Sequence, residues 1–264
     1  MSRAKLQPNL PQSTESGFTI IECLLAIIIV TLLMTAIAPV LALSVATRVQ
    51  SRRVELATNA ARAYIDGLRA GTIPPPPIIS TNPPPALPAP NQNLNNCTQN
   101  RNYCPPRPAN IPLTTPSTTQ LYCINFEADS SSPLQAIKGC TDKSSRAMIV
   151  QAAAYIPRPT GAGVAQPDPT KGYQLRLRVY RADAFTPGRT LLPGNVNNQP
   201  RVAASFTGGT GLGKNQLPLV QMSTEIVTQG TGGTNYLDLC KRLYLQKNPG
   251  RSDTDASAAC PVNN

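Results

Sequence analysis

The sequence predicts an α+β protein in which one long N-terminal helix crosses a membrane and then packs on an antiparallel β-sheet head. The first observation is an uncharged run of 25 residues, 23–47, because about 20 apolar residues cross the hydrocarbon core of a bilayer as a helix. The second is that apolar residues recur at helical spacing beyond this run, until four consecutive prolines at 74–77 forbid further helix. The third is a series of short apolar runs in the remaining chain, which is typical of strands.

The long helix is expected over residues 18–69. Its transmembrane part covers residues 18–47, and an extracytoplasmic part covers residues 48–71. Pro39 lies within the transmembrane part and should kink it, because proline removes one helical hydrogen bond. Beyond the membrane, one apolar stripe would pack on the head. Its residues are Val45, Val49, Leu56, Ala60, Tyr64 and Leu68.

A specific motif stands directly before the apolar run. Residues 17–22 read Gly-Phe-Thr-Ile-Ile-Glu, which resembles the processing site of type IV prepilins and pseudopilins. The resemblance implies that residues 1–17 are a leader, that prepilin peptidase cleaves after Gly17, and that Phe18 becomes a methylated N-terminus. It also implies that Glu22 pairs with the terminal amine of a neighbouring subunit and so sets the register of assembly. The motif covers only the start of the chain.

Two further features bear on this resemblance. The polar leader has no apolar core ahead of the cleavage point, which distinguishes it from a secretory signal peptide. Pro39 occupies a place where many pilin helices carry a proline, so it is assigned to assembly together with Glu22. On the apolar run alone, a simple signal anchor with a stray interfacial glutamate explains the same residues.

The orientation of the membrane segment rests on conflicting observations. Four arginines follow the span, namely Arg48, Arg52, Arg53 and Arg62, whereas the leader carries only Arg3 and Lys5 as basic residues. A count of basic residues would therefore place the C-terminal side in the cytoplasm. The prepilin motif and the cysteines of the head favour the reverse. We follow these two, which predicts a single-pass protein of the inner (plasma) membrane with its head outside the cytoplasm.

The cysteines predict a disulfide-bonded head. The chain has seven cysteines and no histidine. A zinc site is therefore a poor explanation of the cysteines, and disulfides formed in an oxidising compartment are favoured. Cys23 lies in the apolar helix and is expected to be free. Sequence does not select the connectivity, and nearest-neighbour pairing is the simplest choice. It joins Cys97 to Cys104, Cys123 to Cys140, and Cys240 to Cys260.

The head itself divides into two regions. Residues 72–120 are rich in proline and asparagine and are expected to form a variable loop with extended conformation, and residues 121–264 are expected to form the disulfide-bonded sheet. Strands are expected at residues 121–126, 147–155, 173–180, 202–206 and 217–227, followed by a short helix at residues 236–246.

The strand at residues 173–180 alternates between apolar and polar residues, which is typical of a half-buried strand. Its polar side places Arg176 and Arg178 next to each other. With Arg181 they form the densest basic group of the head. A solvated strand face is the simpler interpretation, and an anion-binding patch is the alternative.

The sequence contains no recognisable catalytic site. Histidine is absent, which removes the usual triads and histidine-metal sites. The glycine-rich residues 208–215 resemble a phosphate-binding loop, but Asn215 replaces the required Ser or Thr, and Pro218 follows where a helix is needed. Acidic residues are scattered without a calcium-binding pattern. We therefore expect no enzymatic activity, no cofactor and no metal.

These observations predict a minor pilin or pseudopilin, a structural subunit of a type IV pilus-like machine. Residues 172–185, together with the helix, look like the cyanobacterial hormogonium polysaccharide secretion group, which implies support of polysaccharide export and of linked motility. The implied partners are prepilin peptidase, other pilins or pseudopilins, an inner-membrane assembly platform and, given the net charge of +11, an anionic polysaccharide. Nucleic acid is not favoured.

Two alternatives remain open from the sequence. One is a pseudopilin of a type II secretion or DNA-uptake system. The other is a membrane-anchored protein that binds an anionic polymer and never polymerises.

Overall fold

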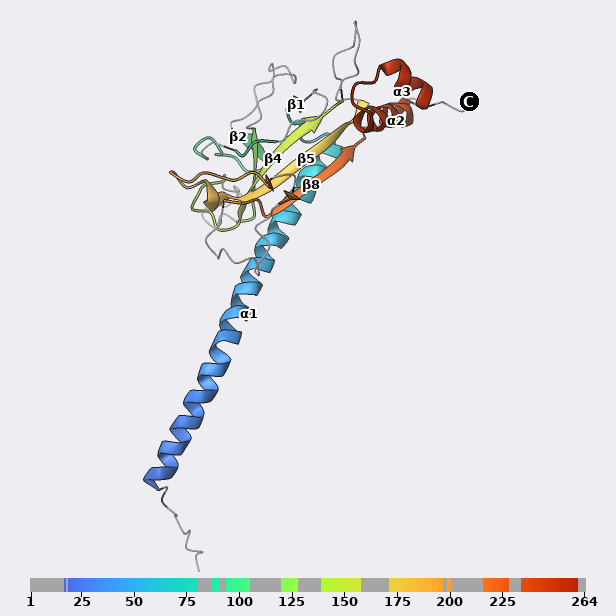
Figure 1. Cartoon of the computed structure of the whole chain (residues 1–264). Coiled ribbons are helices and arrows are strands. Elements are labelled where there is room, and N and C mark those ends of the chain that lie inside the picture. The colour runs from blue at the N-terminus through green and yellow to red at the C-terminus, as the bar shows by residue number, and fades with distance from the viewer. Residues whose placement is uncertain are drawn as a thin grey trace, which may run out of the picture. The chain divides into compact units, whose positions relative to one another are not determined.

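The computed structural model describes residues 17, 19–79, 87–90, 94–104, 120–127, 139–157, 171–196, 199–200, 216–227 and 234–260. The chain comprises two compact units, Met1–Arg48 and Val49–Asn264. Helix α1 (Ile20–Arg69) contributes to both. The second unit also holds a β-sheet and the helices α2 (Thr234–Lys247) and α3 (Asp253–Ala259) (Figure 1).

Five strands of the sheet follow one another in the order β2-β3-β4-β5-β8, and every neighbouring pair is antiparallel. A short strand, β1, adds to β4 in parallel, and two further strands, β6 and β7, form a separate ribbon. The bounds are β1 (Ile78–Ile79), β2 (Asn102–Cys104), β3 (Leu121–Asn125), β4 (Ala147–Tyr155), β5 (Tyr173–Arg181), β6 (Asn195–Val196), β7 (Gln199–Pro200) and β8 (Val220–Ile226).

The predicted α+β class is confirmed, with a long apolar N-terminal helix and an antiparallel sheet. Four of the expected strands are present as β3, β4, β5 and β8, and the expected C-terminal helix is α2. The short elements β1, β2 and α3 were not predicted. The strand expected at residues 202–206 and the glycine-rich residues 208–215 lie outside the described residues.

The C-terminal part of α1 packs on one face of the sheet (Figure 1). The buried positions of α1 recur at steps of three and four, which gathers them on one face of the helix. Small side chains at this contact let the helix lie close to strand residues such as Val150 and Leu177. The buried helix residues are Ala57, Ala60, Ala61, Tyr64, Ile65 and Leu68.

The opposite face of the sheet is buried as well. Leu121, Ile149 and Tyr180 point to this side and pack with Leu94 and Phe185 from the loops that cover it. A strand covered on both faces reads as a continuous apolar run rather than an alternation. This explains why all nine residues of β4 are buried.

Three tyrosines connect α1 to the edge of the sheet. Tyr64, Tyr103 and Tyr122 meet edge to face, with ring centroids 4.9–6.5 Å apart. The hydroxyl of Tyr103 donates to the Pro74 carbonyl (2.8 Å), so the Tyr64 hydroxyl, also 2.8 Å away, donates to Tyr103. Burial, and then the neighbouring Tyr103, raises the pKa of Tyr64 well above its ordinary value. The group therefore stays neutral and hydrogen-bonded.

Helices α2 and α3 pack against each other at one end of the sheet (Figure 1). Arg242 of α2 links them to the strands, since its guanidinium donates to the Lys171 carbonyl and lies 3.4 Å from the Glu225 carboxylate of β8. Ser252 and Asp255 form a capping box that begins α3. Arg242 thus provides a polar connection between α2 and the strands, beside the buried apolar side chain of Leu245.

Replacing Ala60 with Leu should destabilise the head. Ala60 is fully buried between α1 and the sheet, so three extra heavy atoms would force the helix away from the strands, at a cost of about 1–3 kcal/mol. Ala63→Leu is the matched control, because Ala63 lies on the exposed side of the same helix. Thermal unfolding of the full chain in detergent should show a lower midpoint for Ala60→Leu alone. Equal midpoints for the two variants would contradict this packing.

Candidate functional site

The front of α1 carries the motif residues. The helix begins where the backbone N–H groups of Glu22 and Cys23 donate to the Thr19 carbonyl, at 3.0 and 3.2 Å. Glu22 lies in the first turn, where the positive end of the helix dipole stabilises a carboxylate. Its side chain is exposed and makes no ion pair with a described residue. The carboxylate is therefore accessible to a partner from outside the chain.

Gly17 is exposed, and a Cβ built on it would meet no atom within 4 Å. The described fold thus gives no internal reason for a glycine at this position. Phe18, the expected new N-terminus, lies outside the described residues.

The first 30 residues of α1 present an apolar surface with no cover. Every large apolar side chain from Ile20 to Val49 is exposed, with exposed fractions of 43–83%. The helix is long and apolar enough to cross a membrane. The hydroxyls of Thr31 and Thr35 donate to carbonyls of the helix itself, both at 2.9 Å, which suits a surrounding without water.

Two details of α1 bear on the predictions for Pro39 and for the apolar stripe. Pro39 lies inside the helix, which continues on both sides of it; proline cannot donate to the carbonyl of Thr35 four residues earlier. Val45 and Val49 were expected to join the stripe that packs on the head, but both are exposed. Buried positions of α1 begin only at Ala57.

The prediction that Arg176 and Arg178 of β5 both face solvent is wrong for Arg178. Arg178 is only 4% exposed, and its Nη1 donates to the carbonyl of Leu87 at 2.6 Å. Desolvation by burial lowers its pKa. The polar residues of β5 looked solvated because they alternate with apolar ones, but the loop residues 87–90 cover this face of the sheet.

The other two arginines of the group are also engaged within the fold. The guanidinium of Arg176 lies 5.5 Å from the ring centroid of Tyr155, in a cation–π contact. Arg181 forms an ion pair with Asp183. Arg178 is therefore not open to an external anion, whereas Arg176 and Arg181 are partly exposed and engaged with neighbouring side chains.

Arg178 instead belongs to an anchor for the proline-rich loop. Its partner in strand register is Gln151 of β4, which is fully buried and donates from Nε2 to the Pro88 carbonyl at 2.9 Å. Residues 87–90 contain no strand or helix, so their carbonyls need partners from side chains when buried. Arg178 and Gln151 supply these partners.

The structure joins the six head cysteines in nearest-neighbour order, as Cys97–Cys104, Cys123–Cys140 and Cys240–Cys260, and leaves Cys23 free and exposed. The first two disulfides are buried side by side in the cluster that covers the second face of the sheet. The third joins α2 to the end of α3.

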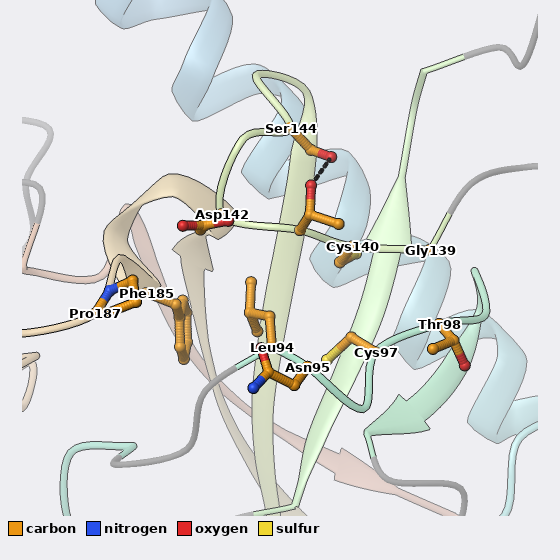
Figure 2. Close-up of a pocket in the computed structure, with 11 residues that line it drawn as sticks. Leu94, Asn95, Cys97, Thr98, Gly139, Cys140, Asp142, Ser144, Phe185 and Pro187 are labelled. Carbon is orange, nitrogen blue, oxygen red and sulfur yellow. Dashed lines mark hydrogen bonds between the residues drawn. The ribbon is translucent and has the colours of Figure 1, made fainter.

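A cavity of about 410 Å³ lies among the loops on this second face (Figure 2). Three segments line it, namely residues 94–98, residues 139–144, and the end of the 3₁₀ helix η2 (Ala182–Phe185) with Pro187. Cys97 and Cys140, from two different disulfides, are both part of the lining. In the described part of the chain no group of three His, Cys, Asp or Glu residues could hold a metal ion.

Comparison of the chain with known protein families, with curated proteins and with solved structures finds no match.

Replacing Arg178 with Met should destabilise the head. The change leaves the buried Leu87 carbonyl without its donor, which costs about 1–3 kcal/mol. Arg176→Met removes the same charge from the same strand but loses only partly exposed contacts, namely the cation–π contact with Tyr155, worth about 0.5–1 kcal/mol, and a hydrogen bond to the Gln174 side chain, and it leaves no buried carbonyl without a donor. Thermal unfolding should separate the two variants.

A second measurement tests the reassignment of these arginines. Retention of the full chain on a polyanionic resin should fall less for Arg178→Met than for Arg176→Met, because the Arg178 guanidinium is buried and the Arg176 guanidinium is partly exposed. A loss of retention for Arg178→Met as large as that for Arg176→Met, at unchanged stability, would show that Arg178 is accessible to anions.

Proposed function

We propose that this chain is a minor pilin or pseudopilin, a membrane-anchored structural subunit of a type IV pilus-like machine. The observation that carries the proposal is the position of the motif: Gly17 and Glu22 stand at the start of a helix whose apolar residues are all exposed as far as Val49. An exposed apolar surface of this size requires lipid or other helices around it. A filament of stacked helices and the membrane both provide this cover.

In this proposal Glu22 directs assembly through its charge. An ionised carboxylate in an apolar bundle is costly unless an opposite charge accompanies it. The terminal amine of Phe18 from a neighbouring subunit is such a charge, once prepilin peptidase has removed the leader. Pairing of the two groups fixes the axial position of each new helix. Pro39 shapes the same helix within the bundle.

The features of the head favour assignment of the chain as a minor rather than a major subunit. The head carries three disulfides and an unusual proline-rich loop anchored on the sheet, features of a specialised subunit. Disulfides require an oxidising compartment, so the head lies outside the cytoplasm and the helix in the inner membrane. The partners are the other pilins or pseudopilins and the inner-membrane assembly platform. We assign the machine to export of an extracellular polysaccharide, from the resemblance of residues 172–185.

Cleavage after Gly17 tests the family assignment. Protein isolated from its native membrane should begin at a methylated Phe18, as measured by intact mass and N-terminal peptide analysis. Gly17→Leu should retain residues 1–17 while the head stays folded, since no atom of the fold lies against Gly17. A mature wild-type protein that keeps its leader would rule out processing and leave the simple membrane anchor.

Replacing Glu22 with Gln tests the assembly role. The change keeps the shape of the side chain and removes its charge, so incorporation into filaments should fall about tenfold or more if the pair is worth at least ~1.4 kcal/mol. Glu55→Gln is the matched control, because Glu55 is exposed on the same helix outside the apolar surface. Both variants should keep the disulfide-bonded head. Filaments containing wild-type amounts of Glu22→Gln would refute the pairing.

A further inference from the structure

The cavity on the second face of the sheet belongs wholly to the head and takes no part in the assembly role of α1. Leu94 and Phe185 provide the apolar part of its lining, and Pro187 extends this part along one wall (Figure 2). The side chains of Asp142, Thr141 and Ser144 provide polar groups from the facing segment. Asn95 and Thr98 add an amide and a further hydroxyl.

The charge of the lining differs from that of the whole protein. The chain carries a net charge of +11, whereas Asp142 is the only charged residue among the described residues that line the cavity. Its carboxylate is half-buried and makes no hydrogen bond or ion pair with another described residue. An ionised carboxylate only accepts hydrogen bonds. The cavity therefore favours a ligand with donor groups and disfavours an anion.

The remaining polar groups can both donate and accept. The hydroxyls of Thr141 and Ser144 lie 3.1 Å apart and hydrogen-bond to each other (Figure 2). A hydroxyl keeps further bonding capacity after one such bond, because it offers one donor and two lone pairs. Hydroxyls beside a carboxylate and an apolar wall match a molecule that has many hydroxyl groups on one side and C–H groups on the other.

The walls of the cavity are held in place by covalent and backbone contacts. The N–H of Cys140 donates to the Cys97 carbonyl at 2.8 Å, and each of these residues belongs to a different disulfide. A Cβ on Gly139 would overlap the Cys97 carbonyl, so only glycine permits this close approach of the two segments. A site fixed in this way loses little freedom when a ligand binds, which favours affinity.

From this lining we propose that the cavity binds one neutral sugar residue of an external glycan. The volume of about 410 Å³ lies at the small end of the range for ligand sites, about 300–1,000 Å³, and suits a single sugar unit. The sugar hydroxyls donate to the Asp142 carboxylate and exchange hydrogen bonds with Thr141 and Ser144. Its C–H face lies on Leu94 and Phe185. An acidic sugar is rejected by the charge of Asp142.

The inference stands without the proposed assembly function, because a head that never entered a filament would keep the same cavity. Saturation-transfer NMR on the full chain tests it, in a phosphocholine detergent that carries no sugar. The probes are the methyl glycosides of glucose, galactose, mannose and N-acetylglucosamine, with glucuronate as the acidic comparator. At least one neutral glycoside should receive saturation, and glucuronate should receive several-fold less.

Variants of the lining identify the site. Asp142→Asn should weaken binding of the neutral glycoside by about tenfold, the loss of roughly one charge-assisted hydrogen bond. Thr141→Val provides a second variant of similar shape, expected to weaken binding less because it removes a neutral hydroxyl rather than a charged group. Asp66→Asn is the matched control, because Asp66 is an exposed carboxylate on α1 and outside the cavity. All three variants should keep the thermal midpoint of the wild type.

Two outcomes would overturn the inference. One is the absence of saturation transfer from all four neutral glycosides, and the other is equal binding by Asp142→Asn and Asp66→Asn. Preference for glucuronate over the neutral probes would replace it with an anionic ligand. The proposed assembly function is unaffected by these results, since it depends on cleavage after Gly17 and on Glu22.

Discussion

The hydrogen bond between the buried Arg178 guanidinium and the Leu87 carbonyl determines how the second face of the sheet is covered. Loop residues without regular structure cannot be buried unless their backbone groups find partners. Arg178 and Gln151 meet that need from adjacent strands, and the loop in turn excludes water from the sheet. Because this side is closed, the sheet carries two cores, one against α1 and one beneath the loops. The cavity forms where these loops do not quite fill the second layer.

Much of the fold could be predicted because its signals are local. The apolar run and the following prolines define α1, and the apolar run of β4 and the alternation of β5 are long enough to identify them as strands. Short elements such as β2, with three residues, are too short to show a periodicity by which they could be recognised in the sequence. Their conformation follows from pairing with β3 rather than from their own composition.

The environment of β5 shows where local pattern fails. Alternation predicts which side chains share a face, and Arg176, Arg178 and Tyr180 do share one. It does not tell whether that face meets water, because the covering residues 87–90 come from a distant part of the chain. The fixed position of Arg178 comes from contacts about 90 residues away in sequence. The cavity could not be predicted from local sequence either, because three separate segments build its lining and none of them carries a recognisable motif.

The three disulfides have a consequence for how the head is made. Their cysteines are 7, 17 and 20 residues apart, and β2, β3, β4 and β5 pair in the order of the chain. A chain that is threaded across a membrane from its N-terminal end exposes each cysteine partner soon after the first. Each crosslink can therefore close before the next pair emerges, and loops this short are entropically easy to close. If the head is exported as proposed, vectorial delivery and local connectivity together limit the opportunity for wrong pairing among six thiols, without any need to hold the head unfolded until it is complete.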